Sequence, residues 1–138
     1  MNFFVLDCSV TMSWCFEDEN TEYSKQILLL LKKIKAIVPC IWPLEVMNVL
    51  KVAENKHRIT TLKSNAFVNL LNSLPIEIDP NLNCLLNKSI LEITRKHSLS
   101  AYDAAYLEIA IRQNIPLISF DKKLCEVAKK EGISIFTT

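Results

Sequence analysis

Glycine is nearly absent from this chain, with one residue among 138. Neither G-x-G-x-x-G nor the P-loop pattern can be written with a single glycine, so the sequence excludes the phosphate-binding loops of nucleotide-binding kinases and Rossmann dehydrogenases. The same scarcity disfavours an all-β meander, because tight hairpin turns commonly require glycine.

Paired cysteine motifs and long apolar segments are missing as well. The five cysteines are odd in number and widely spaced, and no C-x-x-C pair occurs. We therefore expect free thiols in a reducing cytoplasm rather than a zinc site. The first residues, MNFFVLD, lack the basic region of a signal peptide, and no apolar run is long enough to span a bilayer. These features predict a cytoplasmic protein that does not enter a membrane.

Excess charge of either sign is also lacking. Lys and Arg total 16 and Asp and Glu total 15, for a net charge of +1, which excludes a histone-like nucleic-acid binder but permits local clusters of charge. The chain is 50% hydrophobic and 22% charged, as in a compact globular protein. The length suits one domain, which we expect to span residues 1–138.

Short apolar runs alternate with segments of helical period. Strands are predicted at residues 2–6, 36–41, 76–78, 116–120 and 133–136. Helices are predicted at residues 9–16, 21–35, 43–53, 60–74, 83–96, 100–112 and 121–131, with N-caps at Ser9, Thr21, Ser100 and Asp121. Because helices separate nearly all strands, the sequence predicts an α/β fold with a mostly parallel sheet of about five strands, covered on both faces. Pro39 indicates a position near the sheet edge for the second strand.

Four acidic residues stand where an apolar segment gives way to a helix: Asp7, Glu45, Asp103 and Asp121. Each has a structural explanation, because acids stabilise helix N-termini by about 0.3–1 kcal/mol. Ser100 and Asp103 also have the spacing of a capping box. However, the carboxyl ends of parallel strands share one edge, where ligands bind. One crevice could therefore collect several of these carboxylates.

Carboxylates gathered in one crevice repel one another, which raises their pKa values unless a cation neutralises them. Oxygen ligands without convergent His or Cys indicate Mg²⁺ or Mn²⁺ rather than zinc. Such a site suits phosphodiester hydrolysis by water that the metal activates. Ser9, two residues after Asp7, could cap a helix or orient that water.

Basic residues near the acids could hold a polyanion. The candidate phosphate contacts are Lys51, Arg58, Arg112 and Lys122, and the alternative for each is a solvated helix surface. Two further acids are given structural roles. Asp79 precedes Pro80 and is expected in a turn or cap, whereas Glu108 lies about 140° around its helix from Asp103 and is expected to be exposed.

Three segments resemble PIN-domain ribonucleases, and within them the VapC-type toxins of bacterial and archaeal toxin–antitoxin pairs. In chain order they are VLDCSVTMSWCFEDE, VPCIWPLEVMNVLKVAENKHRI and LSAYDAAYLEIAIRQNIPLISFDKKLCEVAKKEGISIF. The resemblance covers essentially the whole chain. It implies an α/β/α sandwich and an Mg²⁺ or Mn²⁺ pocket whose first to fourth acids are Asp7, Glu45, Asp103 and Asp121.

The resemblance also implies roles and partners. Asp103 and Asp7 would be the principal metal ligands, Glu45 and Asp121 would complete the pocket, and Ser9 matches a hydroxyl residue commonly found beside the first acid. Such toxins cleave cellular RNA, are typically dimers, and are inhibited by a small antitoxin. The sequence does not identify which RNA is cut.

Two other classes of function remain alternatives. A PIN fold kept only as a binding scaffold would be favoured if acids were missing, but all four are present. A receiver-like phospho-acceptor domain would need adjacent acids after the first strand, and Asp7 lies between Leu6 and Cys8. The sequence therefore favours a metal-dependent endoribonuclease that leaves a 5′-phosphate and a 3′-hydroxyl.

Overall fold

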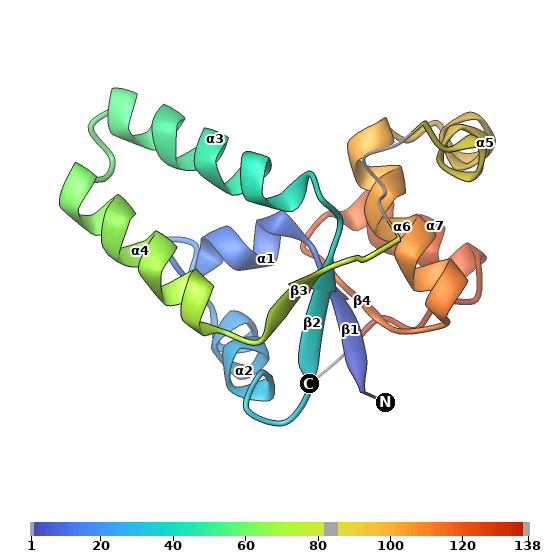
Figure 1. Ribbon diagram of the computed structural model, residues 1–138, viewed down its shortest axis with the longest axis horizontal. Coiled ribbons are helices and arrows are strands. Elements are labelled where there is room, and N and C mark those ends of the chain that lie inside the picture. The colour runs from blue at the N-terminus through green and yellow to red at the C-terminus, as the bar shows by residue number, and fades with distance from the viewer. Residues whose placement is uncertain (1, 82–85, 137–138) are drawn as a thin grey trace.

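A parallel four-stranded sheet forms the centre of the computed structural model, which describes residues 2–81 and 86–136 (Figure 1). The strand order is β3-β2-β1-β4, and every neighbouring pair is parallel. The strands are β1 (Phe3–Leu6), β2 (Lys35–Val38), β3 (Ile76–Ile78) and β4 (Leu117–Ile118). The predicted α/β fold with a central parallel sheet flanked by helices is confirmed.

Seven helices occur in the described residues. They are α1 (Cys8–Ser13), α2 (Glu22–Leu30), α3 (Trp42–Asn55), α4 (Thr61–Ser73), α5 (Lys88–His97), α6 (Ala101–Gln113) and α7 (Lys122–Lys130). In Figure 1, α1 to α4 lie to the left of the sheet and α5 to α7 to its right. Buried apolar residues of the strands, α6 and α7 form one core between these layers.

The helix caps show how local sequence sets the helix starts. The side chains of Thr21, Ser100 and Asp121 each accept a bond from the backbone N–H three residues later, so these three predicted caps are confirmed. The predicted cap at Ser9 is wrong, because α1 begins at Cys8 and Asp7 occupies the N-cap position. Ser9 therefore lies within the helix, where its hydroxyl is directed to another partner.

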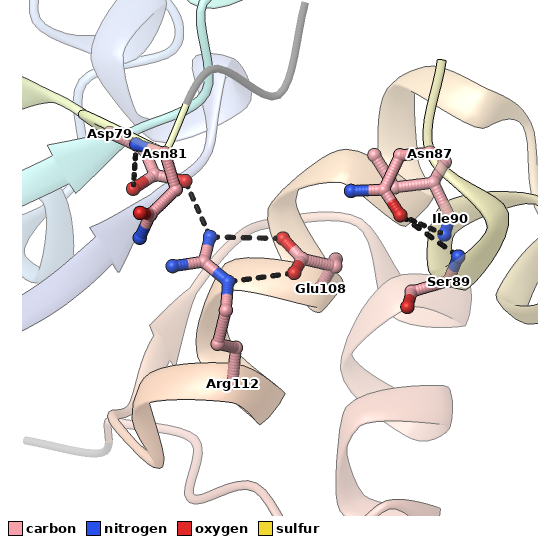
Figure 2. A network of polar contacts seen from close by, with 7 residues as sticks. All are labelled: Asp79, Asn81, Asn87, Ser89, Ile90, Glu108 and Arg112. Atoms are coloured by element: carbon pink, nitrogen blue, oxygen red, sulfur yellow. Dashed lines mark hydrogen bonds and ion pairs between the residues drawn. The ribbon is translucent and has the colours of Figure 1, made fainter. Parts of the chain in front are cut away.

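The helix boundaries differ most from the prediction at the end of α2 and at the start of α5. Helix α2 ends at Leu30 rather than near residue 35, because Lys35 already begins β2. Helix α5 begins at Lys88 because the Asn87 side chain accepts bonds from the backbone N–H groups of Ser89 (2.8 Å) and Ile90 (3.3 Å) (Figure 2). Residues 83–85 of its predicted range lie outside the described residues.

The sheet differs from the prediction in two ways. The predicted fifth strand is a single bridge, in which Ile135 pairs with Leu117, because β4 has only two residues to offer a partner. The predicted edge position of β2 is also wrong, since β2 lies between β3 and β1. Pro39 follows the last residue of β2, so its missing N–H removes no bond from the sheet.

The cysteines do not all remain free thiols. Cys8, Cys15 and Cys125 are free, which confirms the prediction for these three. Cys40 is disulfide-bonded, so the prediction is wrong there, and Cys84 lies outside the described residues. No described helix has the length and apolar character needed to cross a bilayer.

A buried ion network ties the end of β3 to α6 (Figure 2). Arg112 donates to both oxygens of Glu108, from Nε at 2.8 Å and from Nη2 at 3.1 Å, and Nη2 also donates to Oδ2 of Asp79. Asp79 and Glu108 are both buried, and the carboxylate of Glu108 foremost raises the pKa of Arg112.

This network settles three expectations. The predicted turn at Asp79 is confirmed, because its Oδ1 accepts a bond from the Asn81 backbone N–H (3.3 Å). The predicted exposure of Glu108 is wrong, because Arg112, one helical turn later, neutralises the buried carboxylate. Arg112 therefore stabilises the fold, and its guanidinium is not available for the RNA contact predicted from sequence.

Candidate active site

The four acids chosen from sequence lie at helix starts near the carboxyl edge of the sheet. Asp7 follows β1, Glu45 lies in the first turn of α3 after β2, and Asp121 follows β4 as the N-cap of α7. Asp103 differs from the other three, because it lies in the first turn of α6, and α6 follows α5 rather than a strand. Helix α6 packs against β1 and β4, which brings its acidic end toward the same edge.

Electrostatic interactions show that these acids share one neighbourhood. Burial raises the pKa of Glu45 above its ordinary value, and the charges of Asp7 and Asp103 raise it further. Burial likewise raises the pKa of Asp103, and the charges of Asp7 and Asp121 add to that effect. Asp103 therefore interacts with acids on both sides of it, as expected for like charges in one crevice.

Two serine hydroxyls hold the buried carboxylate of Asp7. Ser9 Oγ and Ser119 Oγ each donate to Asp7 Oδ2 at 2.7 Å. Their oxygens in turn accept from the backbone N–H groups of Phe120 (3.0 Å) and Asp121 (2.9 Å). The two serines thus join the β1–α1 turn to the β4–α7 turn. Burial raises the pKa of Asp7, and both hydroxyls oppose that rise.

We expect the substitution Ser119→Ala to lower the free energy of unfolding by about 1.5–3 kcal/mol, because a hydrogen bond to a charged, buried group is lost. Thermal or denaturant unfolding measures this change. Ser73→Ala is the matched control, since Ser73 is exposed and donates only to the Leu70 carbonyl at the end of α4. Equal effects of the two substitutions would show that Ser119 does not hold Asp7.

The second acid, Glu45, is held by a tyrosine. Tyr106 Oη donates to Glu45 Oε1 at 2.6 Å, and the Tyr106 side chain is fully buried. Tyr106 lies three residues after Asp103, so the helix that carries the third acid also positions the second. Trp42 Nε1 donates to Thr11 Oγ1 at 3.0 Å, which fixes the start of α3 against α1.

Sequence reasoning missed both Ser119 and Tyr106. Ser119 is the one polar residue in the run LISF that leads to Asp121, and this position is a local signal that could have identified it. Tyr106 has the helical spacing of a core residue and is indeed buried. Its bond to Glu45 spans 61 positions in sequence, so only the tertiary structure reveals it.

The basic residues divide into two groups. Arg58 is already paired, because its Nη2 contacts Asp18 and Glu19 at 2.8 Å and its guanidinium lies 4.0 Å from the Phe16 ring centroid. An RNA contact by Arg58 is therefore not supported. Lys51 on α3 and Lys122 in the first turn of α7 are exposed, and their contacts with RNA stay predictions.

The donor set fits a hard divalent cation in its chemistry. All four side chains offer oxygen, and the raised pKa values of Asp7, Glu45 and Asp103 reflect burial and, for Glu45 and Asp103, uncompensated negative charge that a cation would neutralise. Within residues 2–81 and 86–136, no three His, Cys, Asp or Glu side chains are arranged to hold a metal ion.

Comparison with known proteins bears on the family and the fold of the chain. The family model described as PIN domain matches residues 4–130. The crystal structure of PAE2754 from Pyrobaculum aerophilum is similar over 90% of this chain and 78% of that chain, with a TM-score of 0.69 and 18% sequence identity. At this identity the likeness shows the fold alone. None of the curated proteins matches the sequence.

Proposed function

Because the chain belongs to the PIN domain family, whose members are typically nucleases that use divalent metal ions, we propose that it is an Mg²⁺- or Mn²⁺-dependent endoribonuclease. The electrostatic coupling of Asp103 with Asp7, Asp121 and Glu45 is the observation that supports this proposal. Membership of this family also argues against the alternative of a receiver-like phospho-acceptor domain.

Each part of the chain has a defined task in the proposed reaction. Asp7 and Asp103 would be the principal ligands of the cation, and Glu45 and Asp121 would complete the pocket. A bound cation would supply the positive charge that activates water and stabilises the phosphate in the transition state. Ser9 and Ser119 orient Asp7, and Tyr106 orients Glu45. Attack by water rather than the ribose 2′-hydroxyl leaves a 5′-phosphate and a 3′-hydroxyl.

We expect the purified protein to cleave RNA when Mg²⁺ or Mn²⁺ is present, to lose this activity in EDTA, and to regain it when the ion is restored. Mg²⁺ should also raise the Tm, because it binds the folded state. Analysis of the product ends tests for the 5′-phosphate. Cleavage that survives both EDTA and Asp103→Asn would contradict the proposal. Absence of both cleavage and stabilisation would favour the binding scaffold.

We further propose that the protein is a toxin in the cytoplasm, inhibited by a small antitoxin, and that it forms a homodimer. A groove of about 960 Å³ between the start of α3, α5 and α6 supports an apolar contact with the antitoxin, because it is lined by exposed Leu44, Leu91 and Tyr102. Exposed Met47 on α3 and Leu62 on α4 offer apolar surface for a second copy.

A further inference from the structure

Exposed aromatic side chains are confined to two positions in the described chain. Six Phe, two Trp and three Tyr are present, and all lie within the described residues. Among them only Tyr102 and Phe120 are exposed, at 60% and 42% of their surfaces. Tyr102 immediately precedes Asp103, and Phe120 immediately precedes Asp121. The two most exposed aromatic side chains of the described residues therefore adjoin two acids of the candidate active site.

This placement is costly for the fold. An aromatic ring is among the largest apolar groups a protein can bury, and leaving it in water forfeits that stabilisation. All the other aromatic side chains are buried or half-buried. The two exceptions lie beside acids whose charges interact, and their exposure is consistent with binding of an aromatic ligand at the site.

Phe120 is held as a rigid platform. Its backbone N–H donates to Ser9 Oγ at 3.0 Å, and its ring lies against the Tyr23 ring, with the centroids 5.8 Å apart at an interplanar angle of 49°. Tyr23 is itself fixed, because its Oη donates to the Phe136 carbonyl at 2.7 Å. One side of the Phe120 ring is thus supported by protein, and the remainder is open to a ligand.

Tyr102 is presented from a second element. It lies in the first turn of α6, whose start is fixed by the bond from the Asp103 backbone N–H to Ser100 Oγ (3.1 Å), and it borders the groove between α3, α5 and α6. Asp103 interacts electrostatically with both Asp7 and Asp121. The interacting acids therefore place Tyr102 and Phe120 beside the same site.

We propose that Tyr102 and Phe120 stack unpaired nucleobases on the two sides of the phosphate that is cleaved. This inference rests on the proposed function and adds two residues that position the substrate. Bases in an RNA duplex stack on one another, whereas unpaired bases are free to stack on aromatic side chains. Such stacking is tolerant of sequence, because every base has a π-face.

The test compares the substitutions Tyr102→Leu and Phe120→Leu on a single-stranded oligoribonucleotide, with Mg²⁺ present. We expect each to lower kcat/KM by about 5- to 150-fold, the range for loss of one stacked base. Tyr102→Phe and Phe120→Trp keep an aromatic ring and should retain activity. Leu29→Ala is the control, because Leu29 is exposed on α2 and has no place in the site. Tm values verify that each variant folds.

Abasic nucleotides provide a measurement that would not respond if Tyr102 and Phe120 had only a structural role. On RNA that lacks the base on one side of the cut, the wild type should cleave as slowly as the matching leucine variant cleaves intact RNA. That variant should cleave the abasic RNA no more slowly than it cleaves intact RNA. A duplex of the same sequence should be cleaved at least about tenfold more slowly.

The outcomes separate the two proposals. If the wild type cleaves RNA but the leucine variants behave like Leu29→Ala, the stacking inference is overturned while the nuclease stands. The stacking inference is also overturned if a leucine variant on abasic RNA shows the product of the two separate decreases in kcat/KM. Cleavage of the duplex as fast as the single strand overturns it as well. A wild type that cleaves no RNA with either ion removes the proposed function, and the stacking inference with it.

Discussion

Replacing Arg112 with alanine is expected to lower the free energy of unfolding by about 3–5 kcal/mol, the range for breaking a buried ion pair from one side. The substitution leaves the carboxylates of Asp79 and Glu108 buried without a counter-charge. Asp79 has no exposed side-chain surface, and that of Glu108 is only 9% exposed. Water therefore has little access to replace the lost guanidinium, and denaturant unfolding should show a large shift in the midpoint.

Controls distinguish the network from a general effect of removing arginine. Arg95→Ala is the matched control, because Arg95 lies exposed in the last turn of α5. Such a surface change is expected within about 0.5 kcal/mol. Combining Arg112→Ala with Asp79→Asn should recover part of the loss, since one unpaired charge is removed. If Arg112→Ala costs no more than Arg95→Ala, the network does not stabilise the fold.

The Arg112 network also bears on the active site through α6. This helix carries Asp103 and Tyr106 near its start and Glu108 and Arg112 toward its end. Because Asp79 follows β3, the ion pair anchors α6 to the far edge of the sheet. A variant that still folds but lacks this anchor should hold Asp103 less firmly against Asp7, and its nuclease activity should fall although no ligand has changed.

Local sequence signals predicted most elements of this fold. Caps such as Thr21, Ser100 and Asp121 work within one helical turn, so the residues that determine them are adjacent in sequence. The interior position of β2 depends instead on which strands pair beside it. The proline rule at Pro39 failed because the strand had already ended at Val38.

The candidate site divides in the same way. Each acid could be chosen from sequence because it follows an apolar segment and begins a helix. Ser119 and Tyr106, which hold two of those acids, lie 112 and 61 positions from their partners. The burial of Glu108 likewise depends on Asp79, which lies in another element and shares Arg112 with it. Sequence patterns report periodicity and capping, whereas these contacts arise only when distant elements pack.

The substitution Asp103→Asn is expected to abolish most metal-dependent cleavage while preserving the fold. Loss of a principal ligand removes several kcal/mol of charge stabilisation, which corresponds to a decrease in kcat/KM of at least about a hundred- to a thousandfold. The cap of α6 should survive, because Ser100 Oγ accepts from the backbone N–H of residue 103 and not from its side chain. Asp18→Asn, in an exposed loop, is the matched control and should cleave RNA normally.

Stability measurements give this substitution a second, independent signature. Burial, and then the charges of Asp7 and Asp121, raise the pKa of Asp103 in the folded protein, so its ionised form destabilises the metal-free fold near neutral pH. Asp103→Asn should therefore be as stable as the wild type or more so at pH 7 without metal. As the pH falls through the raised pKa toward the ordinary value of 3.8, the wild type protonates and this advantage should disappear.

Addition of Mg²⁺ should reverse the order of stability at pH 7. The wild type is expected to gain Tm with rising Mg²⁺ because the ion binds its folded state, and Asp103→Asn is expected to gain much less. A variant that instead unfolds without metal would show that Asp103 acts through the helix cap alone. Retained cleavage in a folded variant would remove Asp103 from the site. An inactive, folded variant with a weakened response to Mg²⁺ is the combination that only a metal-binding role explains.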